Sequence, residues 1–102
     1  EEITGEQMVN ALRLRNVKTG QLSTLEVVGV FVAVGLKPNS QCFADIVELN
    51  ETGHLVTDEL MATLTRGIFA AGDIRRNSAR QIATAVGDGA TAAMSAFRYL
   101  RG

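Results

Sequence analysis

The sequence predicts an α/β fold in which strands and hairpins lead into one long C-terminal helix. Residues 68–71 form a short apolar run that ends at Gly72 and Asp73, and a helical pattern follows after a polar connection. Upstream, residues 30–34 form a continuous β-branched and aromatic run, which is typical of a strand covered on both faces. A strand, a loop and a helix in this order are typical of a nucleotide-binding edge, because ligands of open α/β sheets sit beyond the carboxyl ends of strands.

The first predicted element is a hairpin within residues 1–28. Leucines at positions 12 and 14 alternate with arginines at 13 and 15, and residues 18–20 (Lys-Thr-Gly) supply a turn before the chain returns. Alternation of this kind predicts one solvated face. We interpret the hairpin as structural.

The middle of the chain predicts a stop, a turn and a second hairpin. Gly35 ends the run at 30–34, and Lys37-Pro38-Asn39 forces an extended turn. Residues 47–57 then predict a hairpin that turns at 50–53, and residues 58–65 are interpreted as a connection. We expect Phe43 and Ile46 to face inward, Cys42 to be a small buried residue and His54, the single histidine, to lie on the surface.

The C-terminal helix is predicted from Ser78 onward. Ser78 and Gln81 fit a capping box, which would occupy the Gln81 N–H. Residues 87–92 match G-x-G-x-x-A but lie inside the helical pattern, so we interpret these small residues as packing residues rather than as a dinucleotide fingerprint. Apolar residues spaced by three and four predict one buried stripe; they are Ile82, Val86, Ala90, Ala93, Phe97 and Leu100.

Composition restricts the classes of function. The net charge of −1 argues against nucleic-acid binding, and the apolar stretch at 27–36 is too short to cross a membrane, so we expect a cytoplasmic chain. Cys42 is the only cysteine, so no disulfide can form within the chain. The absence of an initiator methionine, with a start almost directly on a strand pattern, suggests a fragment of a longer protein.

The stretch at residues 65–74, Thr-Arg-Gly-Ile-Phe-Ala-Ala-Gly-Asp-Ile, followed by Arg80-Gln81 and an Ala/Gly-rich helix, resembles the C-terminal FAD signature of bacterial, low-molecular-weight thioredoxin reductases. The stretch at 29–39, Gly-Val-Phe-Val-Ala-Val-Gly-Leu-Lys-Pro-Asn, resembles the segment where the NADPH domain of that family returns to its FAD domain. The resemblance implies that residues 1–35 end an NADPH-binding domain and that residues 36–102 form the C-terminal portion of an FAD-binding domain.

The same resemblance implies the cofactors and the site. In this family NADPH reduces FAD, FAD reduces a Cys-x-x-Cys pair, and that pair reduces thioredoxin. Gly72 and Asp73 would face the ribityl and phosphate portion of FAD, and Arg80, Gln81 and Ile82 would face its isoalloxazine ring. Asn39 is a further candidate near the flavin. No catalytic residue and no metal site are predicted, and the chain alone is expected to be inactive.

Other interpretations of the pattern remain open. The same portion of a peroxiredoxin-reducing flavoprotein or of a ferredoxin-NADP reductase has a similar pattern, although Arg80-Gln81 favours the disulfide reductases. A noncatalytic interaction module without flavin is the alternative from a different class. The partners we expect are the remainder of the same polypeptide, a thioredoxin-like protein and a second copy of the chain, because unpaired strand edges favour self-association.

Overall fold

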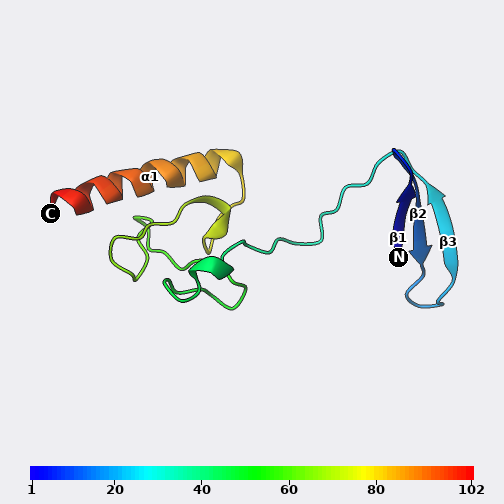
Figure 1. The fold of residues 1–102 in the computed structure, drawn as a ribbon, viewed down its shortest axis with the longest axis horizontal. Helices are drawn as coiled ribbons and strands as arrows, with labels where there is room; N and C mark the ends of the chain where they lie inside the picture. Colours follow the sequence, from blue (N-terminus) through cyan, green and yellow to red (C-terminus); the bar gives the residue numbers. More distant parts are fainter. The chain divides into compact units, whose positions relative to one another are not determined.

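The computed structural model describes residues 1–102, which form two compact units, Glu1–Gly35 and Leu36–Gly102 (Figure 1). Each unit has its own set of internal contacts. The division falls at the boundary drawn from the sequence. The assignment of the two units to an NADPH-binding and an FAD-binding domain stays a prediction.

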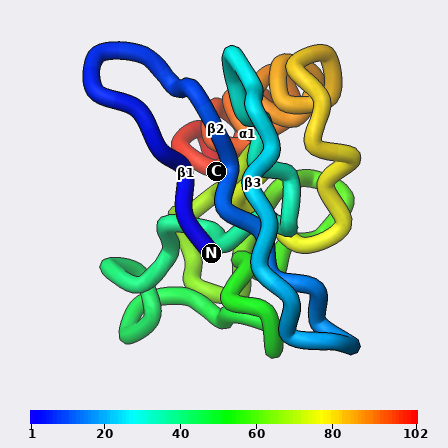
Figure 2. Tube along the Cα trace, turned by 90° about the vertical axis from the view of Figure 1, so that its right-hand side faces the viewer, coloured from blue at the N-terminus to red at the C-terminus, as the bar shows by residue number.

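The first unit is a three-stranded antiparallel sheet of β1 (Glu2–Gly5), β2 (Val9–Arg15) and β3 (Leu22–Glu26), in the order β1-β2-β3 (Figure 2). The predicted hairpin is confirmed as β2 and β3. Its turn is closed by Asn16, whose side-chain oxygen accepts the N–H groups of Lys18 and Thr19. Strand β1, which was not expected, pairs with the other edge of β2.

The two faces of this sheet differ in polarity. One face carries an exposed ion pair between Arg13 and Glu2, which are cross-strand partners 3.0 Å apart. The other face carries Ile3 and Leu25 on either side of Leu12, and both outer side chains are half exposed. The leucine-arginine alternation therefore does separate the faces as expected, but nothing within the unit buries the apolar one.

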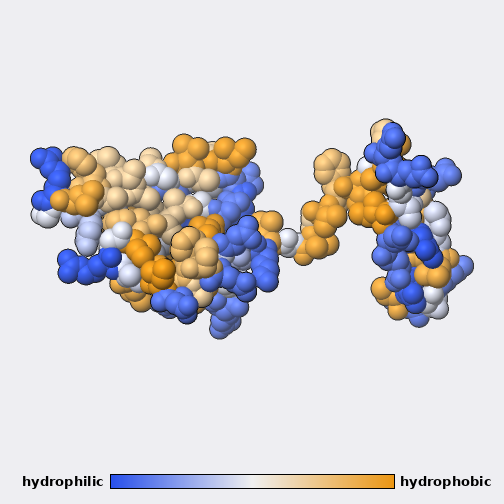
Figure 3. All heavy atoms as spheres, in the orientation of Figure 1, coloured by the Kyte–Doolittle hydropathy of each residue, from blue (hydrophilic) through white to orange (hydrophobic).

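Residues 30–34 do not form the predicted strand. The segment is extended but unpaired, and Phe31, Val32 and Val34 are largely exposed to solvent. Figure 3 shows the apolar spheres that follow this part of the chain. The physical reason is that β propensity mostly expresses packing against neighbouring strands, and no neighbouring strand is present here.

The second unit is built around a small core of Val47, Leu55 and Ala70, against which Leu49, Ile68 and Ile74 pack. The predicted second hairpin forms, with one bridge between Leu49 and Leu55 and a turn closed by the Gly53 N–H on the Asn50 carbonyl at 2.9 Å.

Four side chains near this core are placed differently from the sequence expectation. Cys42, in the short 3₁₀ helix η1 (Gln41–Phe43), is exposed, and Phe43 and Ile46 are 41% and 50% exposed rather than inward-facing. His54, expected on the surface, is only 5% exposed. A core this small buries few side chains, and the histidine is held by hydrogen bonds to Asn50 and Thr52 of the turn.

Residues 68–71 form an extended segment with one antiparallel bridge, between Phe69 and Ala62, rather than a full strand. The preceding connection turns back at Met61 in the left-handed region, with φ of 63°. After this segment the chain enters the 3₁₀ helix η2 (Gly72–Ile74) and forms a parallel bridge between Leu55 and Arg75. The extended segment at residues 68–71 and the helix η2 therefore both lie beside the core, to which Ala70 belongs and against which Ile74 packs.

The long helix α1 (Ile82–Arg101) begins later than predicted, and Gln81 is its N-cap. Its expected apolar stripe is not buried: Ile82 and Leu100 are 87% and 82% exposed, and Val86 and Phe97 are also exposed. Figure 3 shows apolar side chains gathered over the N-terminal half of the helix. The face that packs inward carries Ala85, Asp88 and Ser95 instead. No helix combines the length and apolarity needed to cross a membrane.

Candidate functional site

Two neighbouring segments bring the polar candidates together. The parallel bridge of Leu55 with Arg75 is held by the Leu55 N–H on the Ile74 carbonyl at 2.9 Å and by the Arg76 N–H on the Leu55 carbonyl at 2.8 Å. Because of this pairing, His54 and Asp73 reach one hollow of about 340 Å³, which is lined by Leu36, Lys37, Pro38, Asn39, His54, Asp73 and Ile74.

Asp73 is the acidic group of this hollow. It lies in η2 and its side chain is exposed, so the carboxylate is free to accept hydrogen bonds from a ligand. Asn39 lines the same hollow and offers both an acceptor and two donors. The adjacent Ser40 is 2% exposed and donates its hydroxyl to the Gly53 carbonyl, which fixes the backbone next to Asn39.

Gly72 serves the packing of the helix. Its φ of 79° lies in the region that favours glycine, and a Cβ built on it would stand 3.5 Å from the Cβ of Ala85 in α1. The Gly72 N–H donates to Asp88 Oδ2 at 3.0 Å. The backbone of Gly72 is therefore in contact with α1, and its predicted contact with a cofactor stays a prediction.

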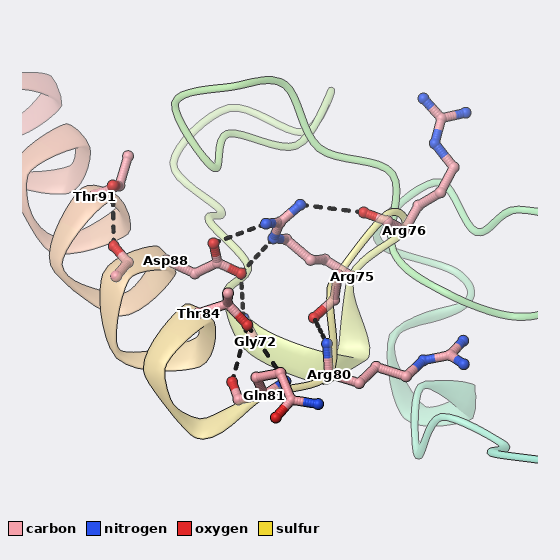
Figure 4. Close-up of polar contacts among 10 residues, drawn as sticks. Gly72, Arg75, Arg76, Arg80, Gln81, Thr84, Asp88 and Thr91 are labelled. Carbon is pink, nitrogen blue, oxygen red and sulfur yellow. Dashed lines mark hydrogen bonds and ion pairs between the residues drawn. The ribbon is translucent and has the colours of Figure 1, made fainter.

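Asp88 and Arg75 form the ion pair that joins the loop to the helix (Figure 4). Arg75 Nε and Nη2 donate to Asp88 Oδ2 and Oδ1 at 2.5 and 2.7 Å, and both side chains are largely buried. This bidentate bond, assisted by the Gly72 N–H, holds the pKa of the Asp88 carboxyl below its ordinary value despite the opposing effect of burial. The same bond raises the pKa of Arg75. Asp88 is therefore ionised, and both of its carboxylate oxygens already accept hydrogen bonds from within the chain.

Arg80 has a strained backbone just before the helix. Its φ of 56° is in the left-handed region, which costs about 1–3 kcal/mol for a residue other than glycine. The Arg80 N–H donates to Ser78 Oγ at 3.1 Å, and its guanidinium Nη2 lies 3.4 Å from His54 Nε2. The side chain of Arg80 thus reaches a residue that lines the hollow.

Gln81 and Ile82 form the start of α1. The predicted capping box between Ser78 and Gln81 is wrong, because Thr84 Oγ1 accepts the Gln81 N–H at 3.3 Å and donates to the Gln81 carbonyl at 2.9 Å (Figure 4). The Gln81 side chain in turn accepts the Thr84 N–H, so the first-turn N–H groups left without an acceptor in the helix are those of Ile82 and Ala83, which remain available to a ligand. The Ile82 side chain itself points into solvent.

The structure therefore brings Asp73 and, through His54, Arg80 to one hollow, whereas Gly72 faces α1. Sequence reasoning missed His54, Arg75 and Asp88. Asp88 gave no signal in the sequence, because the need for a partner follows from its burial, which only the structure shows. His54 gave no signal beyond being a single histidine. No group of three potential metal ligands is present.

The donor set fits part of a flavin nucleotide. A carboxylate and an amide can bind the hydroxyls of a ribityl chain, and a guanidinium and free helix N–H groups suit an electron-rich ring oxygen or a phosphate. The hollow is too small for a whole dinucleotide, so these residues would hold only one portion of it.

Residues 1–89 match the family model of pyridine nucleotide-disulphide oxidoreductases, and the chain belongs to this family. Among curated relatives, it is 43% identical over 100 residues to a 34.2 kDa protein in the rubredoxin operon of Clostridium pasteurianum, covering 98% of this chain and 32% of the relative. It is 42% identical to a Staphylococcus aureus alkyl hydroperoxide reductase subunit, covering 97% of this chain and 20% of the relative.

Among solved structures, thioredoxin reductase from Streptococcus pyogenes matches with a TM-score of 0.76 and 41% identity, covering 99% of this chain and 33% of that one. The chain thus spans about a third or less of the length of these relatives. The comparisons confirm the resemblance stated from the sequence and the fold class, that of part of a flavoprotein with two dinucleotide-binding domains.

Proposed function

We propose that this chain is the FAD-binding C-terminal part of an NADPH-dependent thioredoxin-disulfide reductase. It would supply one wall of the flavin site, and NADPH would bind elsewhere in the whole enzyme. When bound, FAD would carry electrons from NADPH to a disulfide. The cytoplasmic location expected from the sequence belongs to the same proposal.

The residues of the second unit have distinct roles in this proposal. Asp73 accepts hydrogen bonds from hydroxyls of the ribityl chain, with Asn39 beside it. Arg80 and the first-turn N–H groups near Gln81 and Ile82 bind the oxygen side of the flavin ring, where the partial positive charge of a helix start stabilises negative charge by about 0.3–1 kcal/mol. Gly72 would contribute by letting the loop that carries Asp73 approach α1 closely.

The observation that supports the proposal best is the shared hollow. Asp73 and Asn39 come from segments more than thirty residues apart in sequence, yet both line it, and Arg80 contacts a third lining residue. Identity of about 41% to a thioredoxin reductase across nearly the whole chain supports the same interpretation.

Disulfide reduction is not expected from this chain by itself. Cys42 is its only cysteine and is exposed, so it has no partner within the chain for a dithiol cycle. The redox cysteines and the NADPH site would have to come from the remaining portion of the enzyme.

The decisive experiment replaces Asp73 with Ala in the flavoprotein that carries this chain and measures FAD per polypeptide after gel filtration. Losing a charge-assisted hydrogen bond should weaken FAD binding by about tenfold or more. Glu51→Ala is the matched control, because Glu51 is an exposed acid outside the hollow. Full flavin content in Asp73→Ala would remove Asp73 from the site.

A second candidate is the same portion of a peroxiredoxin-reducing flavoprotein. It is favoured by the 42% identity to part of an alkyl hydroperoxide reductase. The two candidates differ in the protein that is reduced, so NADPH oxidation by the whole flavoprotein should be compared with thioredoxin and with a peroxiredoxin system as acceptors. NADPH oxidation that occurs with thioredoxin but not with the peroxiredoxin system would favour the first candidate.

A further inference from the structure

The hydrogen bonds around His54 have only one consistent direction. A guanidinium can donate but not accept, so His54 Nε2 must accept from Arg80 Nη2 across the 3.4 Å contact. A neutral imidazole with an accepting Nε2 carries its proton on Nδ1. That proton then points to Thr52 Oγ1, which lies 2.9 Å away.

The next hydrogen bonds connect this histidine to the turn at residues 50–53. The Thr52 hydroxyl, which accepts from His54, donates to Asn50 Oδ1 at 3.0 Å. The same Asn50 oxygen also accepts the backbone N–H groups of Thr52 at 3.1 Å and His54 at 2.8 Å. A chain of donors therefore runs from Arg80 through His54 and Thr52 to Asn50, and it ends on an oxygen fixed by the backbone.

Arg80 is held at both ends by these contacts. Its left-handed backbone is supported by Ser78, and its guanidinium is supported by a histidine that is 5% exposed. A long arginine side chain on the surface would otherwise sample many rotamers, so the buried acceptor selects a small part of that range. Strain of this kind persists where the surrounding structure determines the conformation.

We propose that His54 is a positioning residue for Arg80, acting as the Nδ1-protonated tautomer set by Thr52. It does not touch the reacting atoms; it pre-orders the guanidinium beside the hollow that Asp73 lines. This inference rests on the proposed function, because the benefit of a pre-ordered Arg80 is realised when FAD binds.

The first test reads the tautomer directly. Nitrogen-15 NMR of the imidazole at a pH where His54 is neutral should show a protonated Nδ1 and an unprotonated Nε2. Thr52→Val removes the acceptor for the Nδ1 proton and should shift the population toward the other tautomer, whereas Thr52→Ser keeps the hydroxyl and the tautomer. A protonated Nε2 in the unmodified protein would overturn the proposal.

The second test measures FAD retention in the flavoprotein that carries this chain. His54→Phe keeps a flat ring without an acceptor and should raise the dissociation constant about fivefold, the usual effect of one lost hydrogen bond. His54→Gln places an amide oxygen near the Nε2 position and should restore binding to within about twofold of the unmodified protein. Far-ultraviolet circular dichroism checks that each variant folds.

Arg80→Met separates the two hypotheses. Loss of FAD in Arg80→Met together with full retention in His54→Phe would overturn the positioning role and leave the proposed function intact. Full retention in both Arg80→Met and Asp73→Ala would overturn the proposed function itself. Equal weakening by His54→Phe and His54→Gln would also contradict the inference, because the acceptor would then be irrelevant.

Discussion

Two faces of α1 differ in a way that reverses the usual rule of burial. The inward face carries Ala85, Asp88 and Ser95, a set that is small or polar. The opposite face carries large apolar residues such as Val86 and Leu100, which are exposed. Apolar residues normally provide the burial that stabilises a helix against its neighbours.

The difference shows what attaches the helix within the second unit. Small side chains allow close approach, and Ala85 packs directly on Gly72. Directional contacts come from Asp88, whose carboxylate accepts two hydrogen bonds from the Arg75 guanidinium and one from the Gly72 N–H. The inward face is therefore held by specific polar contacts, and the apolar face is exposed to solvent.

The largest effect is expected from Asp88→Asn. The substitution keeps the shape but leaves Arg75 buried without a counter-charge, and breaking a buried pair in this manner costs about 3–5 kcal/mol. Urea unfolding of the chain followed by circular dichroism measures the loss. Asp73→Asn, which changes an exposed acid in the same way, should stay within about 0.5 kcal/mol.

The pH dependence of the same pair gives an internal check. The pKa of Asp88 is lowered in the folded state, so its contribution is fully present above the pKa of an unfolded aspartate, which is about 3.9, and is lost as pH falls through the lower folded value. The stability difference between the unmodified chain and Asp88→Asn should therefore narrow in acid. If the stability difference between the two chains stayed constant down to low pH, the ion pair would not be the source of that difference.

An intermediate effect is expected from glycine-to-alanine substitutions with opposite signs. Gly72→Ala forces a side chain into a left-handed conformation against Ala85 and should cost about 1–2 kcal/mol. Gly87→Ala meets no atom within 4 Å and should stabilise α1 by up to about 1 kcal/mol, because alanine is the better helix former. The midpoints of thermal unfolding measure both. Destabilisation by Gly87→Ala would indicate that the outer face is packed.

The smallest effect on stability is expected on the apolar face. Val86→Glu should change the free energy of unfolding by less than about 0.5 kcal/mol, since the side chain is exposed. Ala85→Glu, one residue earlier, should cost about 1–3 kcal/mol, because it overfills the contact with Gly72.

Self-association gives a second readout for the same face. We propose that the exposed apolar residues of α1 and of residues 28–36 make the chain associate with itself. Light scattering should then show less association for Val86→Glu than for the unmodified chain. A compact monomer at high concentration would contradict the proposal.

Sequence patterns predicted elements well where the signal is local. The β2–β3 hairpin follows from alternation and a Gly-containing turn, and the long helix follows from its periodicity. Sequence patterns failed where strand formation or burial depends on a second segment that packs against the first. Residues 30–34 have strand propensity but pair with no other strand, and the residues expected in the buried stripe of α1 are mostly exposed.

The glycines of α1 illustrate the same limit. Gly87 and Gly89 were interpreted as packing residues, yet no atom lies within 4 Å of a Cβ built on either. The close approach is made by Gly72, from outside the helix. A small residue permits contact, but only the tertiary structure shows from which side the contact comes.

The sequence by itself determined the family, the existence of the hairpins and the long helix, and the Gly72-Asp73 turn, because each depends on residues close together in the chain. Only the tertiary structure decided that Asp88 pairs with Arg75, that His54 is buried against Arg80 and which face of α1 packs inward. These contacts join segments 13 to 26 residues apart. Which residues meet in these contacts depends on the path of the loops between them, and no local sequence pattern specifies that path.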